Sequence, residues 1–156
     1  MLAGNGRSRD ADELIALIRT SSDVTEDAIV RVETEALAAN VAFQRGDYAE
    51  AAELAAAAMT PVLRATNWQD YAAAWLVRIR SLQRAGELQT AAREVAAFGA
   101  WAEAGANARQ RMYATLMQAD QARAERDTAK ALQCYVDAMT SAERLGIPED
   151  VVVVGE

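Results

Sequence analysis

The chain has 156 residues, a net charge of −7, no histidine and one cysteine, Cys134. The absence of histidine removes the commonest general base and metal ligand, and neither a Gly-rich phosphate loop nor a G-x-S-x-G motif is present, so we expect no enzymatic activity, metal or cofactor. The acidic balance disfavours direct nucleic-acid binding, and the lack of a signal sequence or membrane-length apolar run predicts a cytoplasmic protein.

Alanine-rich sequence with few glycines and prolines predicts an all-α chain. After a flexible N-terminus over 1–10, the amphipathic "ADELIALIR" predicts a helix over 11–19. Three helix pairs follow, and their predicted bounds are about 25–45 with 48–65, 68–85 with 88–104, and 108–125 with 128–145. Because proline lacks an amide hydrogen, we expect a kink or an early end near Pro61.

The turns between paired helices recur at an interval of forty residues. "GDYAEAAELAAAA" from Gly46 returns as "GELQTAAREVAAF" from Gly86 and, more weakly, as "RDTAKALQCYVDA" from Arg126. An acidic residue that can cap the next helix follows each turn: Asp47, Glu87 and Asp127. Four residues further on, Ala51, Ala91 and Ala131 are small enough to let two helices cross closely. The pattern predicts a repeated helix–turn–helix unit.

Several other residues have predicted structural roles. Asn67 is expected to cap the helix over 68–85. The segment "GAN" from Gly105 is expected to end one helix and cap the next, and Gly146 is expected to end the last helix. Trp68, Trp75 and Trp101 can stack on a ligand or pack in the core; we favour the core, most strongly for Trp75. We likewise favour core packing for Cys134 and for three methionines, Met112, Met117 and Met139.

This arrangement of a helix, a Gly-Asp-aromatic turn and a second helix resembles the tetratricopeptide repeat (TPR) family in a forty-residue form. The small residues that match the family are Ala39, Ala42, Ala51 and Ala58 in the first repeat and Ala119, Ala122, Ala131 and Ala138 in the third. The second repeat keeps Trp75 and Ala91 but has Ile79, Leu82 and Phe98 where the family has smaller residues, and Arg126 replaces a turn glycine. The resemblance implies one domain over 11–146, with repeats at about 28–65, 68–105 and 108–145. It also implies a right-handed superhelical array, an α-solenoid of about seven helices.

The resemblance further implies a ligand-binding concave wall formed by the first helix of each repeat. The implied groove positions are Glu33, Ala36, Asn40, Phe43 and Gln44 in the first repeat, Ala73, Leu76, Arg80, Gln83 and Arg84 in the second, and Tyr113, Leu116, Asp120, Arg123 and Ala124 in the third. Arg80, Arg84 and Arg123 are expected to lie together and to bind a carboxylate or an acidic peptide, since guanidinium groups bind carboxylates in a planar, bidentate way. The alternative is that they are ordinary solvated arginines.

These features predict a non-catalytic scaffold that binds a protein or peptide. Such repeats resemble regulatory segments of bacterial signalling and transcription-regulatory proteins, which makes an adaptor or regulatory arm of a larger protein the expected role. The alternative is a structural module that forms a homo-oligomer, for instance a homodimer through an exposed terminal repeat face, without a peptide ligand.

The final segment, "GIPEDVVVVGE", lies where the forty-residue interval places the start of another first helix. Proline followed by two acidic residues suits a first helical turn, whereas the valines of 151–154 favour a strand. We expect 147–156 to be the start of a truncated fourth repeat, or else a mobile tail.

Overall fold

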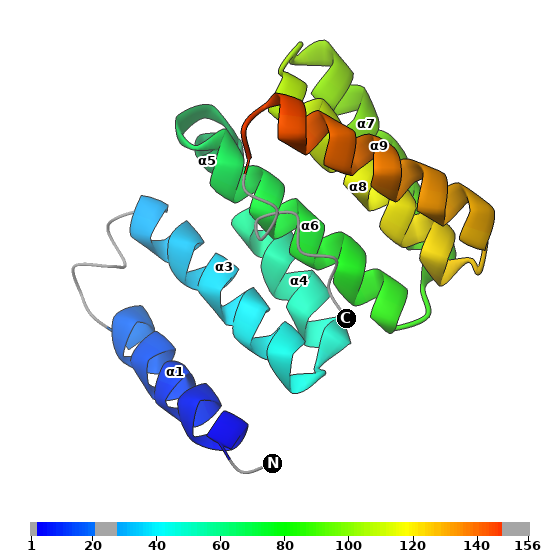
Figure 1. The fold of residues 1–156 in the computed structure, drawn as a ribbon. Coiled ribbons are helices and arrows are strands. Elements are labelled where there is room, and N and C mark those ends of the chain that lie inside the picture. Colours follow the sequence, from blue (N-terminus) through cyan, green and yellow to red (C-terminus); the bar gives the residue numbers. More distant parts are fainter. Residues whose placement is uncertain (1–2, 21–27, 148–156) are drawn as a thin grey trace. The chain divides into compact units, whose positions relative to one another are not determined.

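The computed structural model describes residues 3–20 and 28–147, and within them every regular element is an α-helix. The contacts divide the chain into two compact units, Met1–Ala85 and Gly86–Glu156. The first contains α1 (Ala3–Thr20), α3 (Ala28–Arg45), α4 (Tyr48–Ala58), α5 (Pro61–Thr66) and α6 (Trp68–Arg84); the second contains α7 (Leu88–Ala104), α8 (Ala108–Ala124) and α9 (Thr128–Arg144) (Figure 1). The all-α prediction is thereby confirmed for the described residues.

The helix bounds follow the forty-residue repeat closely, with one difference at the N-terminus. The first helix begins at Ala3 rather than at 11, so residues 3–10, predicted to be flexible, are helical. Extending a formed helix costs far less than nucleating one, which lets it continue through the weak helix formers Gly4 and Gly6. The kink or early end expected near Pro61 is confirmed, because α4 ends at Ala58 and Pro61 begins a separate helix, α5. The Thr60 hydroxyl accepts a hydrogen bond from the Leu63 amide at 3.2 Å. The described part therefore contains eight helices, where about seven were expected.

The helix caps agree only in part with the prediction. The side chains of Asn67 and Asn107 accept hydrogen bonds from the first-turn amides of α6 and α8, as predicted. Asp127 caps α9 in the same way through the Lys130 amide. Asp47 and Glu87 occupy N-cap positions but make no side-chain cap bond. Asp47 instead lies 3.5 Å from the Nε of Arg45.

The three predicted turns share one backbone conformation. Gly46 and Gly86 have φ values of +88° and +82°, and Arg126 adopts the same left-handed region at +64°. Gly146, which ends α9, has φ of +63°, as expected for a helix-closing glycine. The replacement of glycine by Arg126 therefore leaves the turn geometry intact, although a side chain in this region is strained.

In the first unit, α4 packs against both α3 and α6, and α1 packs on α3. The alanines predicted at the crossing of α3 and α4 are all fully buried: Ala39, Ala42, Ala51 and Ala58. Arg78 of α6 donates to the carbonyl oxygen of Ala52 at 3.1 Å, which ties α6 to α4. Trp75 is buried and makes an edge-on contact with Tyr71, with ring centroids 5.7 Å apart, so the prediction of a core role is confirmed.

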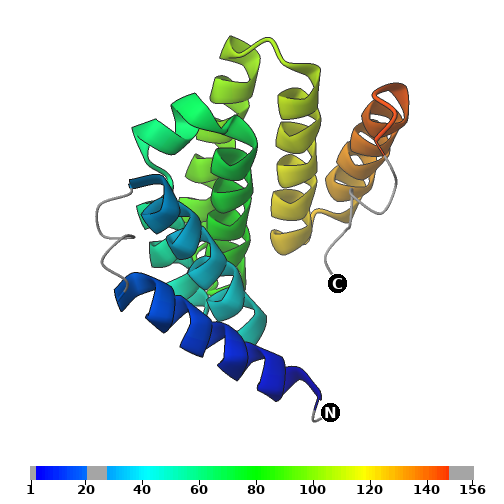
Figure 2. The same cartoon turned by 90° about the vertical axis from the view of Figure 1, so that its left-hand side faces the viewer.

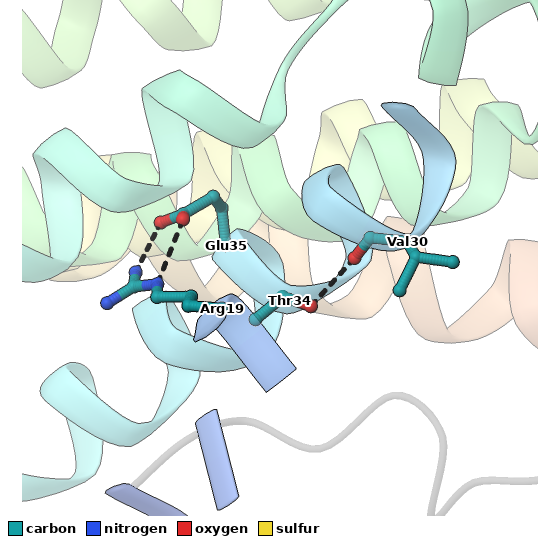
Figure 3. A network of polar contacts seen from close by, with 4 residues as sticks. All are labelled: Arg19, Val30, Thr34 and Glu35. Atoms are coloured by element: carbon teal, nitrogen blue, oxygen red, sulfur yellow. Dashed lines mark hydrogen bonds and ion pairs between the residues drawn. The ribbon is translucent and has the colours of Figure 1, made fainter. Parts of the chain in front are cut away.

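Ion pairs link the N-terminal helix α1 to α3. Arg19 donates to both carboxylate oxygens of Glu35, at 3.1 and 2.6 Å (Figure 3), and Arg45 pairs with Asp12. Ile15 is a buried apolar side chain of this helix, whereas Leu14 and Leu17 are exposed.

In the second unit, α8 lies between α7 and α9 and contacts both (Figure 2). Its core contains Met112 and Leu116 from α8 and Ala138 and Ala142 from α9, with Ile147 packed on them. Met112 and Met117 are buried, as predicted, whereas Met139 and Cys134 are half-buried rather than fully enclosed. Ala119, Ala122, Ala131 and Ala138 are buried like their counterparts in the first unit.

Candidate functional site

A cleft of about 220 Å³ opens in the first unit between α3, α5 and α6. Its lining residues are Glu33, Ala36, Leu37 and Asn40 from α3, Leu63 from α5, and Asp70, Ala73 and Ala74 from α6. The α3 residues are spaced three, four and seven apart, which places them on one helical face. The break at Pro61 positions α5 so that Leu63, which is buried, contributes to the cleft.

The polar groups of the cleft come from Glu33, Asn40 and Asp70. The amide nitrogen of Asn40 donates to the carbonyl oxygen of Ala36 at 2.9 Å, within its own helix. One carboxylate oxygen of Asp70 accepts a hydrogen bond from the Asn67 amide at 2.6 Å, and the backbone amide of Asp70 is bound by the Asn67 side chain in return. This reciprocal cap fixes the start of α6 and hence the position of the Asp70 carboxylate.

Four of the predicted groove positions line this cleft together, namely Glu33, Ala36, Asn40 and Ala73. The other first-unit positions do not line it. Phe43 is half-buried and packs edge-on against Tyr48 with centroids 5.6 Å apart, while Gln44 is exposed. On α6, Leu76, Arg80 and Gln83 are half-buried and Arg84 is exposed.

The second-unit groove positions divide into interior and surface residues. Leu116 belongs to the core, and Asp120 is only 1% exposed. The Asp120 carboxylate accepts a hydrogen bond from the Tyr135 hydroxyl at 2.6 Å and lies 3.6 Å from Nη2 of Arg123. As placed here, Leu116 and Asp120 serve packing rather than an open ligand surface. The surface group consists of Tyr113 and Ala124, which are half-buried, and Arg123, which is exposed.

The predicted basic cluster draws on both units. Arg80 and Arg84 belong to the first unit and Arg123 to the second, so their grouping stays a prediction. Arg123 has a partner of its own, because it pairs with Asp120 one helical turn earlier.

Sequence reasoning missed four lining residues: Leu37, Leu63, Asp70 and Ala74. Leu37 follows Glu33 by four positions, so the helical period alone could have placed it on the cleft face. Asp70 lies in the first turn of α6, ahead of Ala73, the first groove position that the resemblance implied on this helix. Leu63 was not assigned to the groove, because the groove positions implied by the resemblance all lie on first helices and Leu63 lies on α5.

A second hollow, of about 230 Å³, lies between α1, α3 and α4. Its charged lining includes Arg19, Asp12 and Arg45, which already form ion pairs that hold α1 in place. Among residues 3–20 and 28–147 there is no cluster of potential metal ligands. Within the same ranges, none of the helices combines the length and the apolar character needed to cross a membrane.

Comparisons with protein-family models, with curated proteins and with solved structures find no match to this chain. The cleft between α3 and α6 is therefore interpreted from its own residues.

Proposed function

We propose that this chain is a non-catalytic helical-repeat module of the tetratricopeptide type that binds a protein or peptide. Its proposed role is that of an adaptor or regulatory arm of a larger bacterial signalling or transcription-regulatory protein. The observation that carries the proposal is the cleft between α3 and α6, because it is lined by residues of two first helices at positions that the resemblance implies for ligand binding.

The size and openness of the cleft favour a peptide over a small molecule. Sites that enclose a drug-sized ligand usually have volumes of about 300–1,000 Å³. The cleft, at about 220 Å³, is smaller than this and suits one anchoring side chain of a longer ligand. The remaining surface of α3 and α6 is then available to the rest of the peptide.

Selection from a random peptide library displayed on phage tests this proposal. We expect enriched peptides whose binding is lost in Ala73→Trp, because Ala73 is exposed in the cleft and a large ring there fills it. Ala57→Trp is the matched control, since Ala57 is exposed on α4 and does not line the cleft. Failure to enrich any peptide, or equal binding by the two variants, contradicts the proposal.

A specific feature of α9 favours self-association as a second candidate function. Leu132 and Val136, one helical turn apart, are 65% and 51% exposed, and adjacent exposed apolar residues commonly mark an interface. In this case the chain forms a homodimer through α9. Light scattering over a dilution series tests it, with Leu132→Glu expected to give a monomer; a wild-type chain that is monomeric at all concentrations excludes it.

A further inference from the structure

The cleft between α3 and α6 presents hydrogen-bond acceptors and negative charge. Building on the proposed peptide-binding function, we infer that this cleft binds a basic side chain, lysine or arginine, of the peptide ligand. The inference rests on three features of the lining: its charge, its unused acceptor oxygens and its apolar walls.

Both charged groups in the lining are carboxylates, from Glu33 and Asp70, and the lining contains no arginine or lysine. Both residues are exposed at the mouth of the cleft. Within the described part of the chain, the Glu33 carboxylate makes no hydrogen bond or ion pair. A ligand carboxylate in the cleft would be repelled by two like charges, whereas an ammonium or guanidinium group is attracted by both.

The acceptor oxygens in the cleft match a group that has only donors. The Asn40 side chain uses its nitrogen within α3, which leaves Oδ1 available to accept. Asp70 uses Oδ2 for the Asn67 amide and keeps Oδ1. Lysine has three N–H donors and arginine five, and neither has an acceptor, so either head group complements this set of oxygens.

Apolar side chains provide a surface for the aliphatic part of such a residue. Leu37 is 42% exposed although it lines the cleft, and Leu63 lies buried beside it. Ala36 and Ala73 add methyl groups from the two facing helices. Long basic side chains bury their methylene stems on apolar surface while the charged head remains solvated.

Arg80 and Arg84, two of the three arginines that predict an acidic ligand, lie elsewhere on α6. Asp70 and Arg80 are ten residues apart, which corresponds to about 15 Å along a helix axis. A basic residue in the cleft is therefore compatible with an acidic residue of the same ligand near Arg80. The cleft itself discriminates against the acidic residue.

The test uses peptides selected from the phage library on the full chain. We expect enrichment of a lysine or arginine next to apolar residues. The affinity of the best peptide, measured by fluorescence anisotropy, should fall about tenfold in the double variant Glu33→Gln/Asp70→Asn and should also fall with added salt. The control Glu53→Gln/Glu103→Gln removes two exposed carboxylates outside the cleft and should change the affinity less than about twofold.

The outcomes separate this inference from the proposed function. Selected peptides that lack basic residues, yet lose binding in Ala73→Trp, overturn the inference and leave peptide binding in place. Basic peptides that respond equally to the two double variants also overturn it, because general attraction to an acidic protein then explains them. Failure to enrich any peptide overturns both. If the double variant misfolds, Glu33→Gln alone still tests the inference, because Glu33 is exposed and lacks partners among the described residues.

Discussion

The equivalent turns at Gly86 and Arg126 permit a reciprocal exchange of glycine and arginine. An L-residue in the left-handed region is strained by about 1–2 kcal/mol, and Arg126 has φ of +64°. Arg126→Gly removes this strain. Glycine also gives the unfolded chain more conformational freedom, and this entropy reduces the gain in stability by about 0.4–1 kcal/mol. Arg126 is exposed, and its side chain makes no hydrogen bond or ion pair with the described residues. We therefore predict a net stabilisation of about 0.5–1 kcal/mol.

The opposite change, Gly86→Arg, should destabilise the protein by a similar amount. Gly86 has φ of +82°, and a Cβ atom built there meets no heavy atom within 4 Å, so backbone strain and not a clash determines the cost. Urea unfolding followed by helical circular dichroism measures both variants, at high salt to suppress the effect of the charge change. Destabilisation in both directions would refute the argument that the two turns are equivalent.

Further expectations concern the interior of each unit and the surface of α6. Trp75→Ala should lower the unfolding free energy by about 3–5 kcal/mol, because a buried ring leaves a cavity; an unchanged melting temperature would mean that the ring is not packed. Ser81→Ala should stabilise by about 1 kcal/mol in urea unfolding, since the Ser81 hydroxyl is fully buried without a hydrogen-bond partner among the described residues. Tyr135→Phe should cost about 1.5–3 kcal/mol by the same assay, because it removes the hydroxyl that donates to the buried Asp120 carboxylate. Arg80→Glu should abolish binding of an acidic ligand segment in a salt-dependent way without unfolding the protein; salt-insensitive binding that survives the reversal would contradict a role for Arg80.

The sequence predicted the helices well because their signals are local. Turn glycines, capping asparagines and the proline at 61 act within a few residues, and each of them marks a helix boundary in the structure. The sequence did not show that Asp47 and Glu87 would make no side-chain cap bond. Whether a capping side chain bonds to its own helix depends on competing partners, such as Arg45 for Asp47. Helix propensity also underestimated the length of the first helix, because the helix continues through Gly4 and Gly6.

The site was only partly predictable, since a cleft depends on how helices pack. Glu33, Asn40 and Ala73, which line the cleft, were among the groove positions implied by the resemblance to tetratricopeptide repeats. Register does not say which of those positions are covered, and so Leu116 and Asp120 were assigned to a groove although they lie inside the second unit. The cleft has two carboxylates, from Glu33 and Asp70, and the contribution of Asp70 became visible only once α3 and α6 were seen side by side.

The departure of the second repeat from the alanine pattern coincides with the division of the chain. In α3 with α4 and in α8 with α9, buried alanines occupy the repeat positions where two helices cross, and each of these pairs lies within one unit. At the equivalent positions of the second repeat stand Ile79, Leu82 and Phe98, which are also buried, and the boundary between Ala85 and Gly86 falls inside this repeat. The three residues that weaken the resemblance in the sequence thus lie in the same repeat as the boundary between the two units.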